Sequence, residues 1–280
     1  MRKISANKII PAVKKLCIEA NLYLPDDVLS ALKKASRQEN TPQGKEILNQ
    51  ILENSKVAAR EKIPLCQDTG LGVIFVEFGQ ELIVVDGDFY QALQEGVRQG
   101  YQAGYLRKSV VKDPLSRENS QDNTPAIIHA EVVPGDKLKI TFMPKGGGAE
   151  NMSAFANLLP QAGEEGVIDF VIQTVQQAGA RACPPLIVGV GIGGNFEQST
   201  LLAKKSLLRS LSARNKNRRY ALLEQKILKK INSLGIGPQG LGGRITALAV
   251  LIATAPCHIS SLPVAVNIQC HSCRHKSVVL

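Results

Sequence analysis

The spacing of apolar residues changes near residue 72, and this change most constrains how the chain can fold. Before it, apolar side chains such as Ile9 and Val13 recur every three or four positions, the period of an amphipathic helix. After it, short β-branched runs such as Val73–Val76 and Leu82–Val85 alternate with further helical patterns. Because helices come first and a mixture of strands and helices follows, the sequence predicts an α+β fold, with mixed or antiparallel sheets flanked by helices.

The same patterns place the individual elements. Helices are expected along the stripe from Ile9 to Ala20, then at Pro25–Ala35, Pro42–Ala59, Phe89–Tyr101, Val167–Val175, Phe196–Leu211 and Tyr220–Asn232. Besides the two runs above, strands are expected at Ala126–Val132, Leu138–Phe142, Leu186–Val190, Ile245–Ala253 and Pro263–Ile268. Residues 107–124 have no apolar period and are predicted to form a long loop, which in a compact domain is more often functional than idle.

Length and composition favour an ordinary globular protein. With 280 residues and 44% hydrophobic content, the chain can bury a full core. We expect one domain over residues 1–280, with a helical part at about 1–60. No apolar stretch approaches the roughly 18 residues that a membrane span needs, and the basic start carries no apolar signal segment. A cytoplasmic location is therefore expected.

Three glycine-rich segments could bind an anion: Gly146–Gly148, Gly189–Gly194 and Gly240–Gly243. Glycine lets a backbone approach a ligand closely and aim successive N–H groups at a carboxylate or phosphate. The segment at Gly189–Gly194 follows a predicted strand and precedes a helix, as a dinucleotide-binding turn does, but its spacing is not G-x-G-x-x-G and no acidic residue follows at the usual distance. A nucleotide-dependent oxidoreductase is thus an alternative, and a simple tight turn is another.

Three cysteines lie in loops beside predicted strands: Cys66, Cys183 and Cys270. Such positions can hold a metal without disturbing a helix, although separations of 117 and 87 residues match no zinc or ferredoxin motif. The remaining cysteines fit other roles. Cys17 and Cys257 are interpreted as core thiols, whereas Cys273 is close enough to Cys270 to remain an alternative ligand.

At these residues the sequence closely resembles the iron–sulfur (class I) fumarases and their relatives, the L-tartrate dehydratases, over roughly residues 10–275. The resemblance rests on an ordered set of motifs: Leu65-Cys66-Gln67-Asp68-Thr69-Gly70, Asp122-Asn123-Thr124-Pro125-Ala126, Lys145-Gly146-Gly147-Gly148, Gly191-Ile192-Gly193-Gly194, Gly235-Ile236-Gly237-Pro238 with Gly240 and Gly242-Gly243, and Leu262-Pro263-Val264-Ala265-Val266-Asn267. Each motif is weak alone, whereas the ordered set is highly specific.

The resemblance is to the α subunit, or N-terminal half, of that family. It implies a [4Fe–4S] cluster held by Cys66, Cys183 and Cys270. With three protein ligands, one iron is left open and can act as a Lewis acid toward the hydroxyl and a carboxylate of malate. The family's second module would follow Leu280, so a separate β subunit is expected to complete the site.

The resemblance also implies roles for further residues. Asp68 matches an aspartate that takes part in proton transfer, and Gln67 beside it lines the site. Arg107 matches a carboxylate clamp, a task that suits the planar guanidinium fork. By the same resemblance, the N–H groups of Gly147 and Gly148 would bind the other carboxylate of the substrate. His258 corresponds to a histidine that is linked to proton exit.

Each of these side chains also has an ordinary interpretation. Asp68 could cap its loop, Arg107 could be a surface charge, and His258 could be a hydrogen-bonded residue at a strand end. Near the C-terminus, His271 and His275 are interpreted as a solvated tail. Arg244 stands where many relatives have lysine, and its role is open.

Most of the net charge of +10 is local: residues 201–230 carry ten lysines and arginines against the single acid Glu224. A solvated helix pair is the simplest interpretation, followed by docking to an acidic partner or attraction of a dianionic substrate. Nucleic-acid binding is disfavoured, because Tyr220 is the only aromatic residue there.

Together these features predict the α subunit of a fumarate hydratase that interconverts fumarate and S-malate. The nearest alternative is the α subunit of an L-tartrate dehydratase, which shares the motifs and acts on a substrate with one more hydroxyl. A nucleotide-dependent oxidoreductase and a plain binding module are more distant alternatives.

Overall fold

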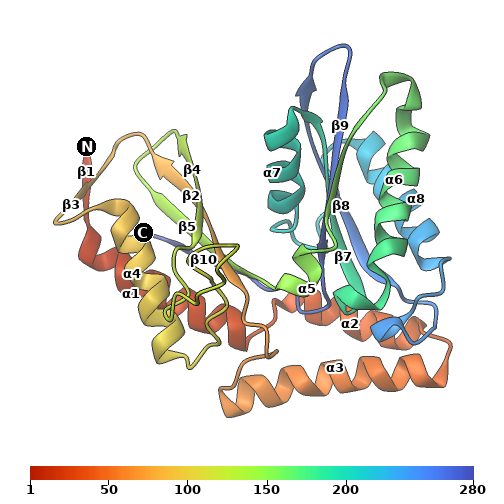
Figure 1. Ribbon diagram of the computed structural model, residues 1–280, viewed down its shortest axis with the longest axis horizontal. Helices are drawn as coiled ribbons and strands as arrows, with labels where there is room; N and C mark the ends of the chain where they lie inside the picture. The colour runs from red at the N-terminus through yellow and green to blue at the C-terminus, as the bar shows by residue number, and fades with distance from the viewer. The chain divides into compact units, whose positions relative to one another are not determined.

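The computed structural model describes residues 1–280, and the chain forms two compact units (Figure 1). Unit 1 comprises residues 1–24, 55–147 and 274–280, and unit 2 comprises residues 25–54 and 148–273. Both mix helices with sheets, so the predicted α+β class is confirmed. None of the helices combines the length and apolar character that a membrane crossing requires. That the whole chain acts as one domain stays a prediction.

Unit 1 is built on a four-stranded sheet with the order β10-β5-β2-β4. Strand β2 runs parallel to β4 and antiparallel to β5, and a separate parallel pair joins β1 to β3. The elements are β1 (Arg2–Ser5), α1 (Ala6–Leu22), β2 (Leu71–Gly79), β3 (Leu82–Val85), α4 (Phe89–Ala103), β4 (Ile127–Val133), β5 (Leu138–Lys145) and β10 (Lys276–Val279).

The core of unit 1 lies between this sheet and helices α1 and α4. Alternate residues of β2, such as Ile74 and Val76, point into it because side chains on a strand alternate between faces. The two helices pack closely against each other, since a Cβ on Gly96 would lie 2.6 Å from the Cβ of Val13. The helical stripe found in the sequence of α1 is therefore the face that it buries.

Unit 2 contains a second four-stranded sheet, with the order β6-β9-β7-β8. Strand β9 is antiparallel to both β6 and β7, whereas β7 and β8 are parallel. The elements are α2 (Asp26–Gln38), α3 (Pro42–Glu61, which continues into unit 1), α5 (Gly147–Glu150), β6 (Ala154–Leu158), α6 (Gly163–Ala178), β7 (Leu186–Gly194), α7 (Phe196–Ser206), α8 (Arg218–Asn232), β8 (Ala247–Cys257) and β9 (Leu262–Gln269).

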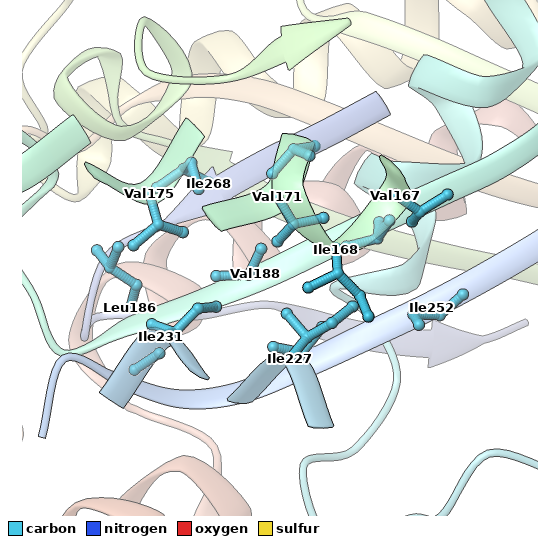
Figure 2. Packing of buried hydrophobic residues seen from close by; sticks show 14 of the residues in the cluster. Val167, Ile168, Val171, Val175, Leu186, Val188, Ile227, Ile231, Ile252 and Ile268 are labelled. Carbon is cyan, nitrogen blue, oxygen red and sulfur yellow. The ribbon is translucent and has the colours of Figure 1, made fainter. Parts of the chain in front are cut away.

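One face of this sheet packs on α6 and α8, and Figure 2 shows the resulting apolar layer. Val171 on α6, Val188 on β7 and Ile227 on α8 are completely buried there. A fully buried aliphatic side chain contributes about 1.5–3 kcal/mol relative to an exposed one. This layer is the main core of unit 2.

The other face of the sheet packs on α7, and the glycines of β7 make this possible. A Cβ on Gly189 would lie 2.2 Å from the carbonyl oxygen of Ala203, and one on Gly191 would lie 2.0 Å from that of Ser199. The turn predicted directly after Val190 lies further along the chain, because β7 continues to Gly194 and α7 begins at Phe196. Gly193 and Gly194, with φ of +90° and +70°, lie at this strand-to-helix turn. Gly189 and Gly191 instead lie within the strand and admit a helix backbone against it.

The remaining differences concern short or irregular elements. Helix α7 ends at Ser206 rather than 211, and the sequence did not indicate strands β1, β6 and β10. These three strands have only four or five residues and lie at sheet edges or in a two-stranded pair. Unlike the equally short β3, which is entirely apolar, each of them contains polar residues and lacks a continuous apolar run.

Within unit 2, the buried carboxylate of Glu39 joins the end of α2 to the glycine-rich loop before β8. Its oxygens accept the backbone N–H groups of Asn40, Thr41, Arg244 and Ile245 at 2.9–3.1 Å. Burial alone would raise the pKa of Glu39, but these N–H groups outweigh it and hold the pKa below its ordinary value. The role of Arg244 was left open by the sequence, and the structure shows that its backbone N–H is one of the donors to Glu39.

Substituting Gly191→Ala should destabilise the protein by about 2–4 kcal/mol, since the new Cβ overlaps the α7 backbone and forces the helix off the sheet. Chemical denaturation would measure this. Val190→Ala, on the opposite face of the same strand, is the matched control: it removes methyl groups from the α6/α8 core without displacing α7. Unchanged stability for Gly191→Ala would contradict the packing role.

Substituting Glu39→Gln should cost about 2 kcal/mol, because an amide cannot accept four backbone N–H groups with both of its polar atoms. Since the folded-state pKa of Glu39 is lowered, its contribution is present above the unfolded-state pKa and is lost as the pH falls through the folded-state value. The stability gap between wild type and Glu39→Gln should therefore narrow in acid. The exposed Glu46→Gln is the control, and a pH-independent gap would contradict the account.

Candidate functional site

The predicted site residues divide between the two units. Unit 1 holds Cys66, Gln67, Asp68, Arg107 and Gly147, and unit 2 holds Gly148, Cys183, His258 and Cys270.

In unit 1, the loop of residues 66–70 before β2 is held by its backbone carbonyls. Arg274 Nη2 donates to the carbonyl oxygen of Asp68 at 2.6 Å, and the Tyr101 hydroxyl donates to those of Thr69 and Gly70 at 2.7 and 2.9 Å. Asn123 Nδ2 adds a bond of 3.1 Å to the Gly70 carbonyl. Three consecutive carbonyls are thus satisfied by buried side chains.

The hydroxyl of Tyr101 remains a donor at any ordinary pH. Its side chain is completely buried, and burial raises its pKa well above the ordinary value. Asn123 is equally buried, and its Oδ1 accepts the N–H groups of Ser109 and Val110 at 2.6 and 3.2 Å. Asn123 therefore fixes the 66–70 loop and the long 107–124 loop together.

The carboxylate of Asp68 is fixed by two backbone donors. Gly147 N–H donates to Oδ2 at 2.8 Å and Gly70 N–H to Oδ1 at 3.0 Å. The bond from Gly70 is the loop cap considered in the sequence, whereas the bond from Gly147 joins Asp68 to the Lys145–Gly148 motif. The Gly147 N–H expected to bind a substrate carboxylate thus binds the carboxylate of Asp68 here.

Cys66 begins this loop, and Arg107 contacts it from the long 107–124 loop. The half-buried Cys66 Sγ accepts the Asp68 N–H at 3.4 Å. The side chain of Arg107 is exposed, and its backbone carbonyl accepts the Thr69 hydroxyl at 2.9 Å. Unit 1 therefore brings together Cys66, Asp68, Arg107 and Gly147 around one ordered loop.

In unit 2, Cys183 and Cys270 lie at the same end of the sheet. Strands β7 and β9 are antiparallel, with Ile187 opposite Gln269, so the segment before β7 is next to the segment after β9. The backbone N–H of His271 donates to the Cys183 carbonyl at 3.4 Å, and its Nδ1 lies 3.0 Å from the same oxygen. The fold thus brings these two predicted ligands to neighbouring segments.

Two glycines approach the segment that leads to Cys183. A Cβ on Gly148 would lie 3.3 Å from the Arg181 carbonyl oxygen, and one on Gly240 would lie 2.3 Å from the Cβ of Ala180. Cys183 itself has a φ of +53°, in the left-handed region that non-glycine residues rarely adopt. Such backbone conformations cost of order 1–3 kcal/mol and concentrate at functional sites.

His258 lies elsewhere in unit 2. It sits in the connection between β8 and β9, two strands that β7 separates in the sheet. This connection is at the opposite end of β9 from Cys270, and the intervening eight-residue strand spans about 26 Å. Its Nδ1 accepts the backbone N–H of Ser260 at 3.2 Å and lies 2.7 Å from the Ser260 hydroxyl. The hydrogen-bonded strand-end interpretation describes these contacts, and a role in proton exit stays a prediction.

Several expectations for the other cysteines and histidines change. Cys17 is buried, and burial raises its pKa, as expected for a core thiol, but Cys257 is exposed at the end of β8 and is not one. Cys273 is buried, with its Sγ 3.9 Å from the Leu207 carbonyl oxygen. His271, bonded to the segment before β7, is not part of a solvated tail, and neither is the half-buried His275.

The basic segment is partly neutralised by acids of its own unit. Lys226 Nζ lies 2.5 Å from Glu165 of α6, and Arg209 pairs with Glu224 at 2.6 Å. The segment comprises the end of α7, residues 207–217 and most of α8, and docking to an acidic partner stays a prediction.

Sequence reasoning missed Tyr101, Asn123 and Arg274 as parts of the site. Asn123 lies inside a motif that carries the resemblance, and this is a signal that could have found it. Tyr101 follows the apolar stripe of α4, and Arg274 follows Cys273 without any local pattern. Their role becomes visible only when the carbonyls that they bind are known.

The donor set fits an iron–sulfur cluster chemically. Cys66, Cys183 and Cys270 are thiols outside disulfides, they lie in loops, and thiolates are the ligands that such clusters require. No group of three or more His, Cys, Asp or Glu side chains in the structure is arranged to hold a metal ion. The ligand set stays a prediction.

Comparison with known proteins identifies the family. The family model described as "Fumarate hydratase (Fumerase)" matches residues 10–279. A Methanocaldococcus jannaschii protein named "Putative L(+)-tartrate dehydratase subunit alpha" is 43% identical over 269 residues, which cover 94% of each chain. An Escherichia coli protein named "L(+)-tartrate dehydratase subunit alpha" is 32% identical over 269 residues, covering 95% of this chain and 88% of the relative. The chain therefore belongs to the fumarate hydratase (Fumerase) family.

Proposed function

We propose that this chain is the α subunit of a hydro-lyase that removes water from a four-carbon hydroxy-dicarboxylate, with L(+)-tartrate as its substrate. The family match over almost the whole chain supports the reaction class, and the names of the relatives support the substrate. The observation that supports the chemistry is the Asp68 carboxylate, which two backbone N–H groups hold in the loop that also carries Cys66.

The residues that would hold the cofactor are Cys66, Cys183 and Cys270. A [4Fe–4S] cluster with three protein ligands supplies an open iron, which acts as a Lewis acid on a hydroxyl group. Proton transfer and binding of the substrate carboxylates are carried out by residues of this chain and of its partner.

Asp68 is suited to move the proton in this reaction. Its two oxygens accept N–H bonds from Gly147 and Gly70, so its position is fixed while lone pairs remain for a substrate proton. Arg107, with its exposed guanidinium, binds a substrate carboxylate through two parallel N–H bonds. Gln67 is exposed next to Asp68 in the chain. The N–H groups of Gly147 and Gly148 would bind the other carboxylate of the substrate.

Fumarate and S-malate are the second candidate substrate pair, since the family model carries the fumarate hydratase description. Malate and tartrate differ by one hydroxyl group. A site built to bind that hydroxyl discriminates strongly against the substrate that lacks it, because its polar groups would be left unpaired.

The proposal includes a separate β subunit and a cytoplasmic location. The relatives are named as α subunits, which supports a partner chain that completes the site. We expect the α chain alone to hold the cluster but to turn over slowly or not at all.

The substrate is tested by measuring kcat/KM for L(+)-tartrate and S-malate with the anaerobic complex of both subunits. Tartrate should be preferred at least tenfold, which corresponds to about 1.4 kcal/mol in transition-state binding. A comparable preference for malate would replace the proposed substrate by the second candidate and keep the reaction class. Turnover of neither would overturn the proposed function.

The ligand set is tested by replacing each cysteine with serine and measuring iron and sulfide after anaerobic purification. Wild type should contain about four of each per chain, and Cys66→Ser, Cys183→Ser and Cys270→Ser should each lose most of both. Cys257→Ser is the matched control, since Cys257 is also an exposed thiol of unit 2. Equal loss from Cys273→Ser, or full loading of any of the three variants, would contradict the assignment.

A further inference from the structure

A buried arginine lies behind the loop that carries Asp68. The side chain of Arg274 in unit 1 is almost completely enclosed, with 3% of the residue exposed. Its Nη2 donates to the carbonyl oxygen of Asp68 at 2.6 Å. This is a short bond from a charged donor, the class of hydrogen bond that is roughly twice as strong as a neutral one.

The rest of this guanidinium is unpaired. Its Nε and Nη1 atoms are buried and have no hydrogen-bond partner. An enclosed cation with unsatisfied N–H groups is expensive, because each lost hydrogen bond to water costs of order 1–3 kcal/mol. An apolar side chain of similar size would avoid that cost. Fold stability therefore does not explain why an arginine occupies this position.

The position of the Asp68 carbonyl does explain it. The carbonyls of Asp68, Thr69 and Gly70 all bind buried donors, and the first of these donors is Arg274. With its carbonyl fixed on the buried side, the Asp68 residue presents its carboxylate to the N–H groups of Gly70 and Gly147. Tyr101 cannot do this for Asp68, since its hydroxyl already serves the next two carbonyls.

We propose that Arg274 is a positioning residue for Asp68: its buried guanidinium fixes the backbone of the 66–70 loop and thereby the direction of the proposed catalytic carboxylate. This inference rests on the proposed function, in which Asp68 moves a proton. Displacing a catalytic group by about 1 Å can lower a rate 100-fold. Substrate affinity depends less on this carboxylate, so the effect falls on kcat rather than on KM.

The test compares Arg274→Met and Arg274→Lys with wild type in the full-length chain. Methionine fills the cavity without charge or donors, and lysine keeps the charge and N–H donors at a single nitrogen but lacks the planar fork. Arg209→Met in unit 2 is the matched control, because Arg209 also has a buried, unpartnered Nε and donates to a backbone carbonyl, that of Ile252.

Hydrogen exchange of the amides of Asp68, Gly70 and Gly147 is the primary readout, since these N–H groups bond within the loop or to Asp68. Arg274→Met should raise their exchange rates at least about tenfold, while the amides of β2 and β5 keep theirs. With the β subunit, kcat should fall about 10- to 100-fold and KM should stay within about threefold. Arg274→Lys should recover part of both losses, and Arg209→Met should change neither.

Unchanged exchange at Asp68, Gly70 and Gly147 in a folded Arg274→Met chain would overturn the proposal, as would a loss of activity confined to KM. If Arg274→Met does not fold, Arg274→Lys decides: faster exchange confined to these amides supports the proposal, and wild-type exchange overturns it. The exchange readout needs no turnover, so a wild-type complex without hydro-lyase activity would refute the proposed function separately.

Discussion

The candidate site depends on how the backbone of residues 66–70 satisfies its carbonyl groups. A loop at the start of a buried strand must find partners for its polar groups, because each unsatisfied one costs of order 1–3 kcal/mol. Here Tyr101, Asn123 and Arg274 supply these partners from three distant parts of the sequence. The same loop carries Cys66 and the Asp68 carboxylate, which the N–H groups of Gly70 and Gly147 hold. The order of this loop therefore also fixes the residue that we propose as the proton carrier.

Much of the fold was predictable because its main elements carry long apolar patterns. The stripe through Ile9 and Val13 corresponds to α1, and the run at Val73–Val76 lies within β2. The equally short β3 was found because all four of its residues are apolar, whereas β10 begins with Lys276 and Ser277 and was missed. The two compact units were also not visible, because each is assembled from segments far apart in the chain.

The glycine-rich segments show that one sequence pattern can have different physical causes. All three suggested loops that bind an anion, yet Gly189 and Gly191 lie within β7 and admit the backbone of α7. Gly148 instead approaches the segment before Cys183. The sequence could place Cys66, Cys183 and Cys270 near strand ends, and the ordered set of motifs made the resemblance to the family specific. It could not find Arg274, whose importance depends on which carbonyl it meets after folding.

The central claim is that Cys66, Cys183 and Cys270 hold one cluster with a single open iron. Mössbauer spectroscopy of the ⁵⁷Fe-labelled complex, recorded with and without L(+)-tartrate or S-malate, tests this most directly. The account predicts that the signal of one iron in about four changes when a substrate binds, because only the open iron accepts a new ligand. Four irons that stay unchanged on addition of either acid, or a complex that contains no iron, would contradict it.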